Sequence, residues 1–372
     1  MSNCLPKQSD VVVVGGGPAG LATAIAARRH GLSVLVADGA VPPIDKACGE
    51  GLMPDGVEAL QQLGVRIPNN QARAFRGVRF VNGAQKAEAV FPHGTAYGIR
   101  RTALHRILHD HAAAAGAILA WRTPVSRLCT EGAIVGGELV RARWVVGADG
   151  GNSRVRRWAD LDANAGESTR MAARRHYRVA PWTDFVEVHW SEHRQAYVTP
   201  VGAEEVCVAL IYNNDRVQFD NALAEFGELS AHLKGAERTS DERGAVSANR
   251  KLRCVYRGNV ALAGDASGSV DAITGEGLCL AFRQAALLGE CLAANSLGPY
   301  QAEHSKLIRR PALMARLMLL MGRHSGLRER TMQVFASTPR AFAAMLSMHI
   351  GAGSARDYVA DGISLGWQLL TV

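Results

Sequence analysis

Long hydrophobic runs are missing from this 372-residue sequence. No uncharged apolar stretch reaches the ~18 residues that a helix needs to cross a bilayer, so we expect no transmembrane segment. A secretory leader is not indicated either, because the strand-like run 11–14 begins almost at once with no cleavage-site pattern behind it. These features predict a cytoplasmic protein.

Paired cysteines are missing as well. The seven cysteines are scattered, odd in number and include no Cys-x-x-Cys pair, which is typical of reduced thiols and not of a disulfide framework or a zinc site. His105 and His109 lie one helical turn apart, but no third ligand completes a known motif. We therefore expect no metal.

Charge of one sign is not concentrated in any segment. Hydrophobic residues make up 48% of the chain and charged residues 20%, an ordinary globular composition that argues against long disorder. The formal net charge of +8 suits an anionic cofactor, NADPH or an anionic membrane surface. Because the basic residues are dispersed and no nucleic-acid module is recognisable, we expect no nucleic-acid partner.

What the sequence does contain is a glycine-rich turn between a strand and a helix near its start. The apolar run 11–14 leads into a G-x-G-x-x-G pattern at residues 15–20, and a helical segment follows over 21–30. A second apolar strand, 33–37, ends at Asp38. Strand, glycines, helix, strand and acid in this order predict a dinucleotide-binding unit.

Each position of this turn has a mechanical reason. Gly15 permits the tight turn, Gly17 lets the backbone approach a pyrophosphate, and Gly20 lets the helix pack close to the strand. Pro18 and Ala19 complete the turn, and the helix N-terminus behind them faces the phosphate charge. We expect all five residues to contact the cofactor.

Asp38 is an acceptor for ribose hydroxyls, and its position favours FAD or NAD over NADP without separating the first two. Two later segments distinguish FAD from NAD by their resemblance to known fingerprints. Residues 144–156, with Asp149 in an Asp-Gly pair, resemble the second fingerprint of the aromatic hydroxylase flavoprotein superfamily. Residues 259–266, ending in Gly264 and Asp265, resemble its third. The resemblance implies that FAD binds here and that Asp265 holds its ribityl chain.

The third fingerprint continues through Gly275, Glu276 and Gly277 into a helix. In the superfamily that this segment resembles, the N-terminus of this helix points at the flavin ring. A strand-to-helix turn exposes backbone N–H groups, which stabilise the negative charge that gathers on the flavin upon reduction.

Further motifs narrow the resemblance to the geranylgeranyl reductase branch. The run Lys46-x-Cys48-Gly49-x-Gly-Leu and the Thr-Gly-Glu-Gly segment at 274–277 are similar to that branch, and Arg101 matches an Arg-x-x-Leu element that contacts FAD there. Lys46, Cys48 and Gly49 are then expected near the flavin. The aromatic strand that lines a prenyl channel in those reductases is not kept, because residues 196–202 carry Thr199 where bulky aromatic residues are expected.

The fold class predicted is α/β: a Rossmann-type FAD-binding domain with an inserted mixed β-sheet substrate domain and a C-terminal helical region. Residues 215–248 are expected to form charged helices that cover the inserted sheet. The apolar, Met-rich and Arg-rich C-terminal region suits helices packed on the FAD domain; a wall around a lipophilic tail and a peripheral membrane contact are the alternatives. The predicted boundaries are 1–70, 101–165 and 255–297 for the FAD-binding domain, 71–100 and 166–254 for the substrate domain, and 298–372 for the helical region.

Substrate contacts are less clearly marked than cofactor contacts. Cys48, His189 and Tyr197 are the candidates, with plain core packing as the competing interpretation of each. No catalytic residue is assigned, because the flavin carries most of the chemistry.

Three functions remain open from the sequence. The first is a monooxygenase that uses NADPH or NADH as a transient reductant and dioxygen to hydroxylate an aromatic or phenolic-lipid-like substrate. The second is a reductase of a lipid or prenyl carbon–carbon double bond. The third is a non-catalytic flavoprotein that assists the maturation of another enzyme. The missing channel aromatics favour hydroxylation of a small organic substrate, a lipophilic one included.

Overall fold

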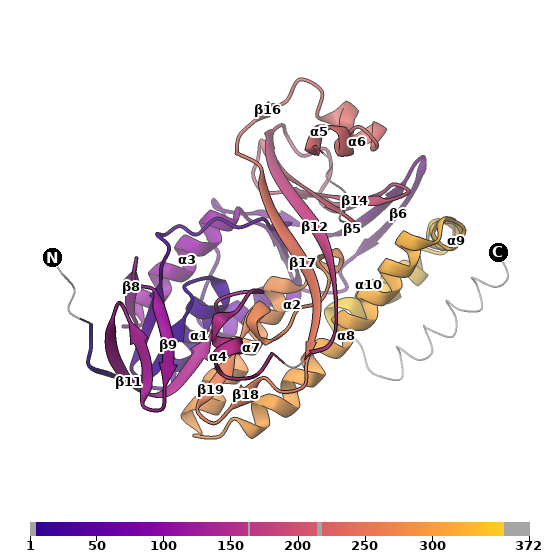
Figure 1. Cartoon of the computed structure of the whole chain (residues 1–372). Helices are drawn as coiled ribbons and strands as arrows, with labels where there is room; N and C mark the ends of the chain where they lie inside the picture. The colour runs from indigo at the N-terminus through magenta and orange to yellow at the C-terminus, as the bar shows by residue number, and fades with distance from the viewer. Residues whose placement is uncertain (1–4, 163, 214–217, 353–372) are drawn as a thin grey trace.

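The computed structural model describes residues 5–162, 164–213 and 218–352. Two large β-sheets, each accompanied by helices, make up most of the molecule, and the C-terminal helices lie along the second sheet (Figure 1). This arrangement confirms the predicted α/β fold class. The predicted domain boundaries stay a prediction, and the part of the helical region at 353–372 lies outside the described residues.

The first sheet is built around the N-terminal strand. Val11 and Val13 face one apolar core while Val12 faces another, so an unbroken valine run is buried on both sides. β1 pairs in parallel with both of its neighbours. The path of this sheet runs β18 (Tyr256–Arg257), β19 (Val260–Leu262), β11 (Glu138–Gly147), β1 (Gln8–Val14), β2 (Val34–Asp38) and β8 (Ile118–Trp121), with β9 (Val125–Cys129) and β10 (Gly132–Val135) beside β11.

Helices cover the faces of this sheet. α1 begins at Pro18, whose missing N–H costs nothing in the first turn, and ends before Gly31, which has a φ of +81°. α1 packs against α7, which follows the turns η1 and η2. The helices and helical turns in this part of the molecule are α1 (Pro18–Arg29), α2 (Pro54–Gln62), α3 (Arg101–Ala114), α4 (Arg154–Trp158), η1 (Gly264–Ser267), η2 (Ala272–Thr274) and α7 (Gly277–Ala293).

The second sheet is mixed and comes mainly from the middle of the chain. β5 pairs in parallel with β13 and antiparallel with β6, while the remaining neighbours are antiparallel. Its path runs β16 (Glu237–Arg238), β12 (Asn164–Arg178), β15 (Glu205–Tyr212), β14 (Arg194–Pro200), β13 (Phe185–Trp190), β5 (Gly77–Asn82) and β6 (Gln85–Val90), with β17 (Arg243–Leu252) on β12. A small sheet of β3 (Gly51–Leu52), β7 (Ala96–Gly98) and β4 (Arg73–Phe75) adjoins it.

The expectation of charged helices throughout 215–248 is only partly correct. Two short helices, α5 (Phe219–Leu223) and α6 (Gly227–His232), are present, but β16 and β17 follow them. β17 pairs with β12 along most of its length. The tertiary partner therefore overrides the weak helical preference of the sequence from residue 243 onward.

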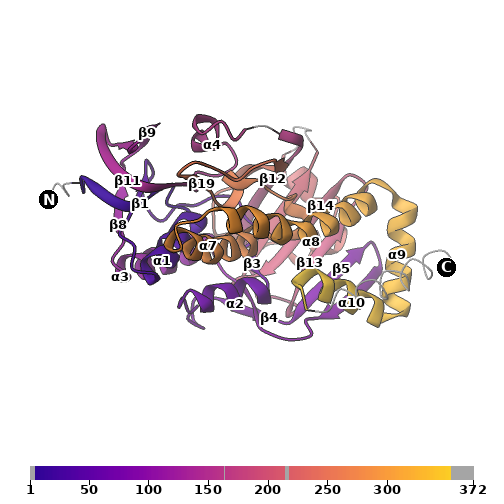
Figure 2. The ribbon, with the colours of Figure 1, turned by 90° about the horizontal axis from the view of Figure 1, so that it is seen from below.

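The C-terminal helices join the two sheets. α8 (Gly298–Arg323) runs from beside α7 towards the second sheet, and α9 (Ser325–Ser337) and α10 (Pro339–Ile350) pack on the strands β5 and β6 (Figure 2). None of the described helices is long and apolar enough to cross a membrane. One end of the second sheet is thus closed by helices.

The contact between α1 and α7 generates a stability prediction. A Cβ at Gly289 would lie 2.6 Å from Ala26 Cβ and 3.0 Å from the Ala26 carbonyl carbon, so Gly289→Ala forces two backbones apart. We expect it to lower the free energy of unfolding by about 1–3 kcal/mol in urea titrations at fixed FAD. Gly326→Ala, at an exposed position of α9 with open space around it, is the control and is expected to raise the free energy of unfolding by up to about 1 kcal/mol. Equal stability of Gly289→Ala and wild type would contradict the close packing.

Candidate functional site

The three glycine-containing segments of the sequence converge on one place. A Cβ at Gly15 would lie 2.5 Å from the carbonyl oxygen of Ala148, next to Asp149 in the second segment. A Cβ at Gly264, in the third segment, would lie 2.6 Å from Ala19 Cβ. The glycine turn and the start of α1 therefore touch both later segments at distances that leave no room for a side chain at Gly15 or Gly264.

Gly20 also has a packing reason inside the protein. A Cβ there would lie 1.9 Å from the carbonyl oxygen of Gly15, so the helix can approach the turn only because this residue has no side chain. Gly275 has a φ of +69°, the left-handed conformation that lets the chain turn into α7.

At three other glycines, neither packing nor backbone conformation within the protein requires the absence of a side chain. An added Cβ at Gly17, Gly49 or Gly277 would have no protein atom within 4 Å, and none of them has a left-handed backbone. Gly17 has a φ of −72°, which any residue adopts. The open space beside these residues fits a molecule that approaches the main chain closely, as a pyrophosphate does at a helix N-terminus.

Asp38 lies where a ribose would meet the glycine turn. Its Oδ2 accepts a hydrogen bond from the Gly16 N–H at 2.7 Å, and its Oδ1 accepts one from the Ala40 N–H at 2.8 Å. Each carboxylate oxygen has a second lone pair for a hydroxyl donor. The residue is thus held in place by the turn that it follows and fits the predicted role.

The charged candidates for cofactor contact differ in burial and in their partners. Lys46 Nζ lies 3.1 Å from Asp265 Oδ2, with both side chains about half exposed. Arg101 is buried, its Nε has no hydrogen-bond partner among the described residues, and burial lowers its pKa. An incompletely satisfied buried guanidinium at this position fits an anionic or carbonyl-rich cofactor.

Asp149 is already engaged inside the protein. Its Oδ1 accepts a hydrogen bond from Ser153 Oγ at 2.5 Å, and its Oδ2 accepts hydrogen bonds from the N–H groups of Arg154 and Val155. These contacts satisfy the N-terminus of α4. A contact between Asp149 and the cofactor stays a prediction.

An apolar cavity lies between the second sheet, the C-terminal helices and the turn before α7. Its free volume is only about 40 Å³, so side chains fill most of it. The lining residues are Met53, Val78, Phe80, Val186, Val188, Tyr197, Ile273, Thr274, Met314, Met318, Phe342, Met345, Leu346 and His349. A larger depression of about 640 Å³ at Arg175 and 238–242 is polar, and none of the converging glycine segments lines it.

Of the three substrate candidates, Tyr197 alone lines this cavity. Its hydroxyl donates a hydrogen bond to the Ile273 carbonyl, and burial raises its pKa. His189 does not line the cavity.

His189 lies on the face of β13 opposite to the lining residue Val188, and its Nε2 is 3.0 Å from Glu187 Oε2. Burial alone would raise the pKa of Glu187, but its hydrogen bonds, of which that with His189 has the largest effect, lower the pKa to about 2. Cys48 does not line the cavity, and burial raises the pKa of its thiol.

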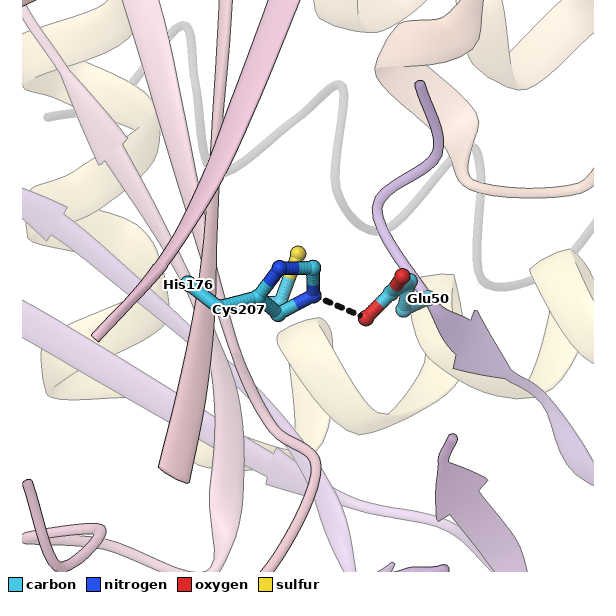
Figure 3. Close-up of side chains that lie close together, drawn as sticks. All are labelled: Glu50, His176 and Cys207. Carbon is cyan, nitrogen blue, oxygen red and sulfur yellow. Dashed lines mark hydrogen bonds and ion pairs between the residues drawn. The ribbon is translucent and has the colours of Figure 1, made fainter. Parts of the chain in front are cut away.

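The loop that carries Cys48 is bound to the second sheet by one cross-strand row. His176, Cys207 and Thr199 are paired neighbours on β12, β15 and β14. His176 Nε2 lies 2.6 Å from Glu50 Oε2 (Figure 3), and Thr199 Oγ1 donates a hydrogen bond to the Gly49 carbonyl at 2.7 Å. Cys207 Sγ lies 3.7 Å from the Cys48 carbonyl oxygen. Thr199, the departure from the reductase pattern, therefore fixes this loop and does not line the cavity.

Glu50 is the buried charge at the centre of this contact. Its Oε1 accepts a hydrogen bond from the Arg101 N–H at 2.9 Å and lies 3.8 Å from Arg174 Nε. Glu50, His176 and Cys207 are side-chain types that bind metal ions, and their ligand atoms lie within 4.8 Å of one another. The nearby guanidinium and the two hydrogen bonds already compensate the carboxylate, so a structural role accounts for it.

Glu276 lies at the other end of the site, at the start of α7. Both of its oxygens lack a hydrogen-bond partner in the part of the chain that the structure describes, and burial together with nearby Asp55 raises its pKa well above the usual range. His349, on α10, is 3.1 Å from Glu276 Oε1. The sequence analysis did not single out Glu50 or His349, because their partners are distant in the chain and no spacing motif contains them.

Removal of the His176 imidazole, which contacts Glu50, is predicted to lower the stability of the fold. His176→Ala leaves the buried Glu50 carboxylate with one hydrogen bond and with the Arg174 guanidinium at 3.8 Å, so we expect the free energy of unfolding to fall by about 3–5 kcal/mol. His193→Ala, at an exposed position, is the matched control and is expected to change it by less than about 0.5 kcal/mol. Denaturant titration of both variants measures the difference. A His176→Ala variant as stable as the control would show that Glu50 does not depend on the imidazole.

Known proteins resemble this chain over most of its length. A menaquinone reductase from Mycolicibacterium smegmatis is 28% identical over 330 residues, which cover 81% of this chain and 80% of the relative. A digeranylgeranylglycerophospholipid reductase from Thermoplasma acidophilum is 26% identical over 332 residues, covering 81% and 83%. The crystal structure of a flavoprotein/dehydrogenase from Cytophaga hutchinsonii has the same fold, with a TM-score of 0.83, 17% identity and coverage of 98% and 99%.

These relatives confirm the resemblance drawn from the motifs at 46–52 and 274–277. The family model described as "FAD binding domain" matches residues 8–306, which include the converging glycine segments and the Cys48 loop. The chain therefore belongs to the FAD-binding-domain family and is an FAD-dependent oxidoreductase.

Proposed function

We propose that this enzyme is a monooxygenase that hydroxylates the aromatic ring of a lipophilic, phenol-like substrate. NADPH or NADH acts as a transient reductant, and one atom of dioxygen enters the product while the other leaves as water. The observation that carries the proposal is the apolar cavity between the second sheet and the C-terminal helices. Met53, Ile273 and Thr274 line it, and these residues belong to the segments that adjoin the proposed flavin position.

The cofactor itself would be held mainly by main chain. Bound FAD, once reduced, supplies the electrons that activate dioxygen. The open main chain at Gly17, Gly49 and Gly277 suits close contact with it, and Asp38 suits the ribose. The residues proposed to contact FAD are Gly15, Gly17, Pro18, Ala19, Gly20, Asp38, Lys46, Cys48, Gly49, Arg101, Asp149, Gly264, Asp265, Gly275, Glu276 and Gly277.

The polar groups of the cavity favour hydroxylation over reduction of a double bond. Reduction requires a proton as well as a hydride at the substrate. The hydroxyls of Tyr197 and Thr274 both donate to backbone carbonyls, and burial lowers the pKa of His349 to about 4, so this imidazole is neutral at pH 7. No lining side chain is thus poised as an acid. An apolar pocket supports hydroxylation, because side chains fill most of its volume and leave little room for water at the reacting centre.

Reduction of a lipid double bond is the second candidate. The names of the two reductases that match most of this chain favour it. Cys48 lies on the loop that faces the proposed flavin position, although it does not line the cavity. The two candidates differ in oxygen use, which makes them separable.

Gly17→Ala tests the cofactor position. The added methyl group meets no protein atom, so we expect the free energy of unfolding of the FAD-free protein to change by less than about 0.5 kcal/mol. If a pyrophosphate occupies that space, the dissociation constant of FAD rises by about tenfold or more, equivalent to about 1.4 kcal/mol. Calorimetric titration of FAD measures this. Gly227→Ala, also in open space but on α6, is the control and should bind FAD as wild type does. Unchanged affinity in Gly17→Ala would place the pyrophosphate elsewhere.

Product analysis tests the reaction. We expect 4-alkylphenols and 5-alkylresorcinols to accelerate NADPH or NADH oxidation in air and to yield products heavier by one oxygen atom, labelled when ¹⁸O₂ is supplied. A parallel anaerobic reaction contains geranylgeraniol and the same reductant. Saturation of a geranylgeraniol double bond without oxygen uptake, with no labelled phenol product in air, would overturn hydroxylation in favour of reduction.

A further inference from the structure

One end of the apolar cavity has a histidine with an unused acceptor. The His349 side chain, on α10, is 8% exposed and lines the cavity. Its Nε2 lies 3.1 Å from the Thr274 carbonyl oxygen. Because a carbonyl oxygen only accepts hydrogen bonds, the proton of the neutral imidazole is on Nε2 and Nδ1 has a lone pair. Nδ1 has no hydrogen-bond partner among the described residues.

The surroundings keep this imidazole neutral. Burial lowers the pKa of His349 to about 4. The hydrogen bond to the Thr274 carbonyl has the opposite, smaller effect, because it favours the protonated imidazole. Burial also raises the pKa of Glu276, whose Oε1 is 3.1 Å from Nε2 but makes no hydrogen bond with it. The raised pKa disfavours the charged form of Glu276, so this carboxyl group stabilises an imidazolium less than an ordinary carboxylate would. Nδ1 is therefore available as an acceptor at neutral pH.

The other polar side chains that line the cavity are satisfied within the protein. The Tyr197 hydroxyl donates to the Ile273 carbonyl, and the Thr274 hydroxyl donates to the Asp271 carbonyl at 3.2 Å. Among the lining residues, His349 Nδ1 is thus the polar side-chain atom left without a partner. A buried acceptor without a donor is unfavourable, and a ligand that brings a donor removes this cost.

We propose that the cavity binds an amphipathic small molecule whose hydroxyl group donates a hydrogen bond to His349 Nδ1 while its apolar body packs among the methionine and phenylalanine side chains. This inference rests on the proposed function and names the substrate class of the same site. It selects phenols and alcohols with an apolar body over ethers and hydrocarbons of the same shape.

The position of His349 also orients the ligand. Its imidazole is bonded to Thr274, in the turn that leads through Gly275 into α7. The hydroxyl end of the ligand is therefore held beside that turn, and its apolar body extends towards Phe80 and Val188 on the second sheet. The head group thus lies at the proposed flavin end of the cavity.

Flexible side chains make room for such a ligand. The free volume of about 40 Å³ is too small for an alkylphenol, but Met53, Met314, Met318 and Met345 all line the cavity. Methionine has three rotatable side-chain bonds and repacks around irregular shapes. Ligand entry is accompanied by rotation of these thioethers, so the cavity opens without a change of fold.

Binding of two matched probes tests the inference. Titration calorimetry with FAD-loaded enzyme, without NADPH or NADH, compares 4-hexylphenol with its methyl ether, which has the same apolar body and no donor. We expect wild type to bind the phenol about tenfold or more tightly, since only the phenol satisfies the buried acceptor. His349→Leu should lose this preference, and His349→Asn should keep part of it because its side-chain oxygen is attached at the position of Nδ1.

His324→Leu is the matched control, because His324 is exposed and outside the cavity, and it should keep the preference of wild type. Each variant serves as its own reference through the phenol-to-ether ratio, so a modest loss of stability does not affect the outcome. If His349→Leu does not fold, the wild-type ratio decides. Equal affinities in wild type, or an unchanged ratio in His349→Leu, would overturn the inference.

The test is separate from that of the proposed function. A preference for the phenol that depends on His349, with no oxygenated product in air, would overturn hydroxylation and leave the binding site standing. Hydroxylation of the probe without any preference over the ether would overturn the role of His349 and leave the reaction standing.

Discussion

Close approach of main chain to main chain at a few glycines is the constraint on which the rest of this structure depends. A Cβ at Gly20 would lie 1.9 Å from the Gly15 carbonyl oxygen, and one at Gly15 would lie 2.5 Å from the Ala148 carbonyl oxygen. Gly264 packs against the side chain of Ala19, where a Cβ would lie 2.6 Å from Ala19 Cβ. These contacts bring three segments from distant parts of the chain to the start of α1. Exposed main chain at this point is what a dinucleotide site of the predicted kind requires.

A second constraint couples the glycine segments to the second sheet. The Cys48 loop is bound to the cross-strand row formed by His176, Cys207 and Thr199, and buried Glu50 connects that row to the start of α3 through the Arg101 N–H. A buried carboxylate is tolerated only with such partners. The Cys48 loop is therefore fixed by the sheet that lines the cavity, while α8 and α10 line the cavity from the other side.

Sequence reasoning succeeded where the signal is local. The valine run, the glycine turn and Gly31 predicted β1, the turn and the end of α1, because burial on both faces and a left-handed residue leave few alternatives. It failed over 243–248, where a segment expected to be helical belongs to β17 and pairs with β12. It also could not tell which face of β13 lines the cavity, because that depends on how the sheet packs against the C-terminal helices; the structure places Val188 there and His189 on the other face.

The sequence by itself determined the dinucleotide-binding unit and the α/β architecture, because the G-x-G-x-x-G turn between strand and helix is a short pattern whose geometry is set by backbone sterics. The choice of FAD followed from the resemblance of two later segments to flavoprotein fingerprints. Only the tertiary structure decided which polar atoms are left unpaired. His349 meets Thr274, and Glu50 meets His176, across chain separations that no spacing pattern encodes. Hydrogen-bond satisfaction in a buried site is a property of the packed whole, so the acceptor that selects the ligand emerges only when the helices close on the sheet.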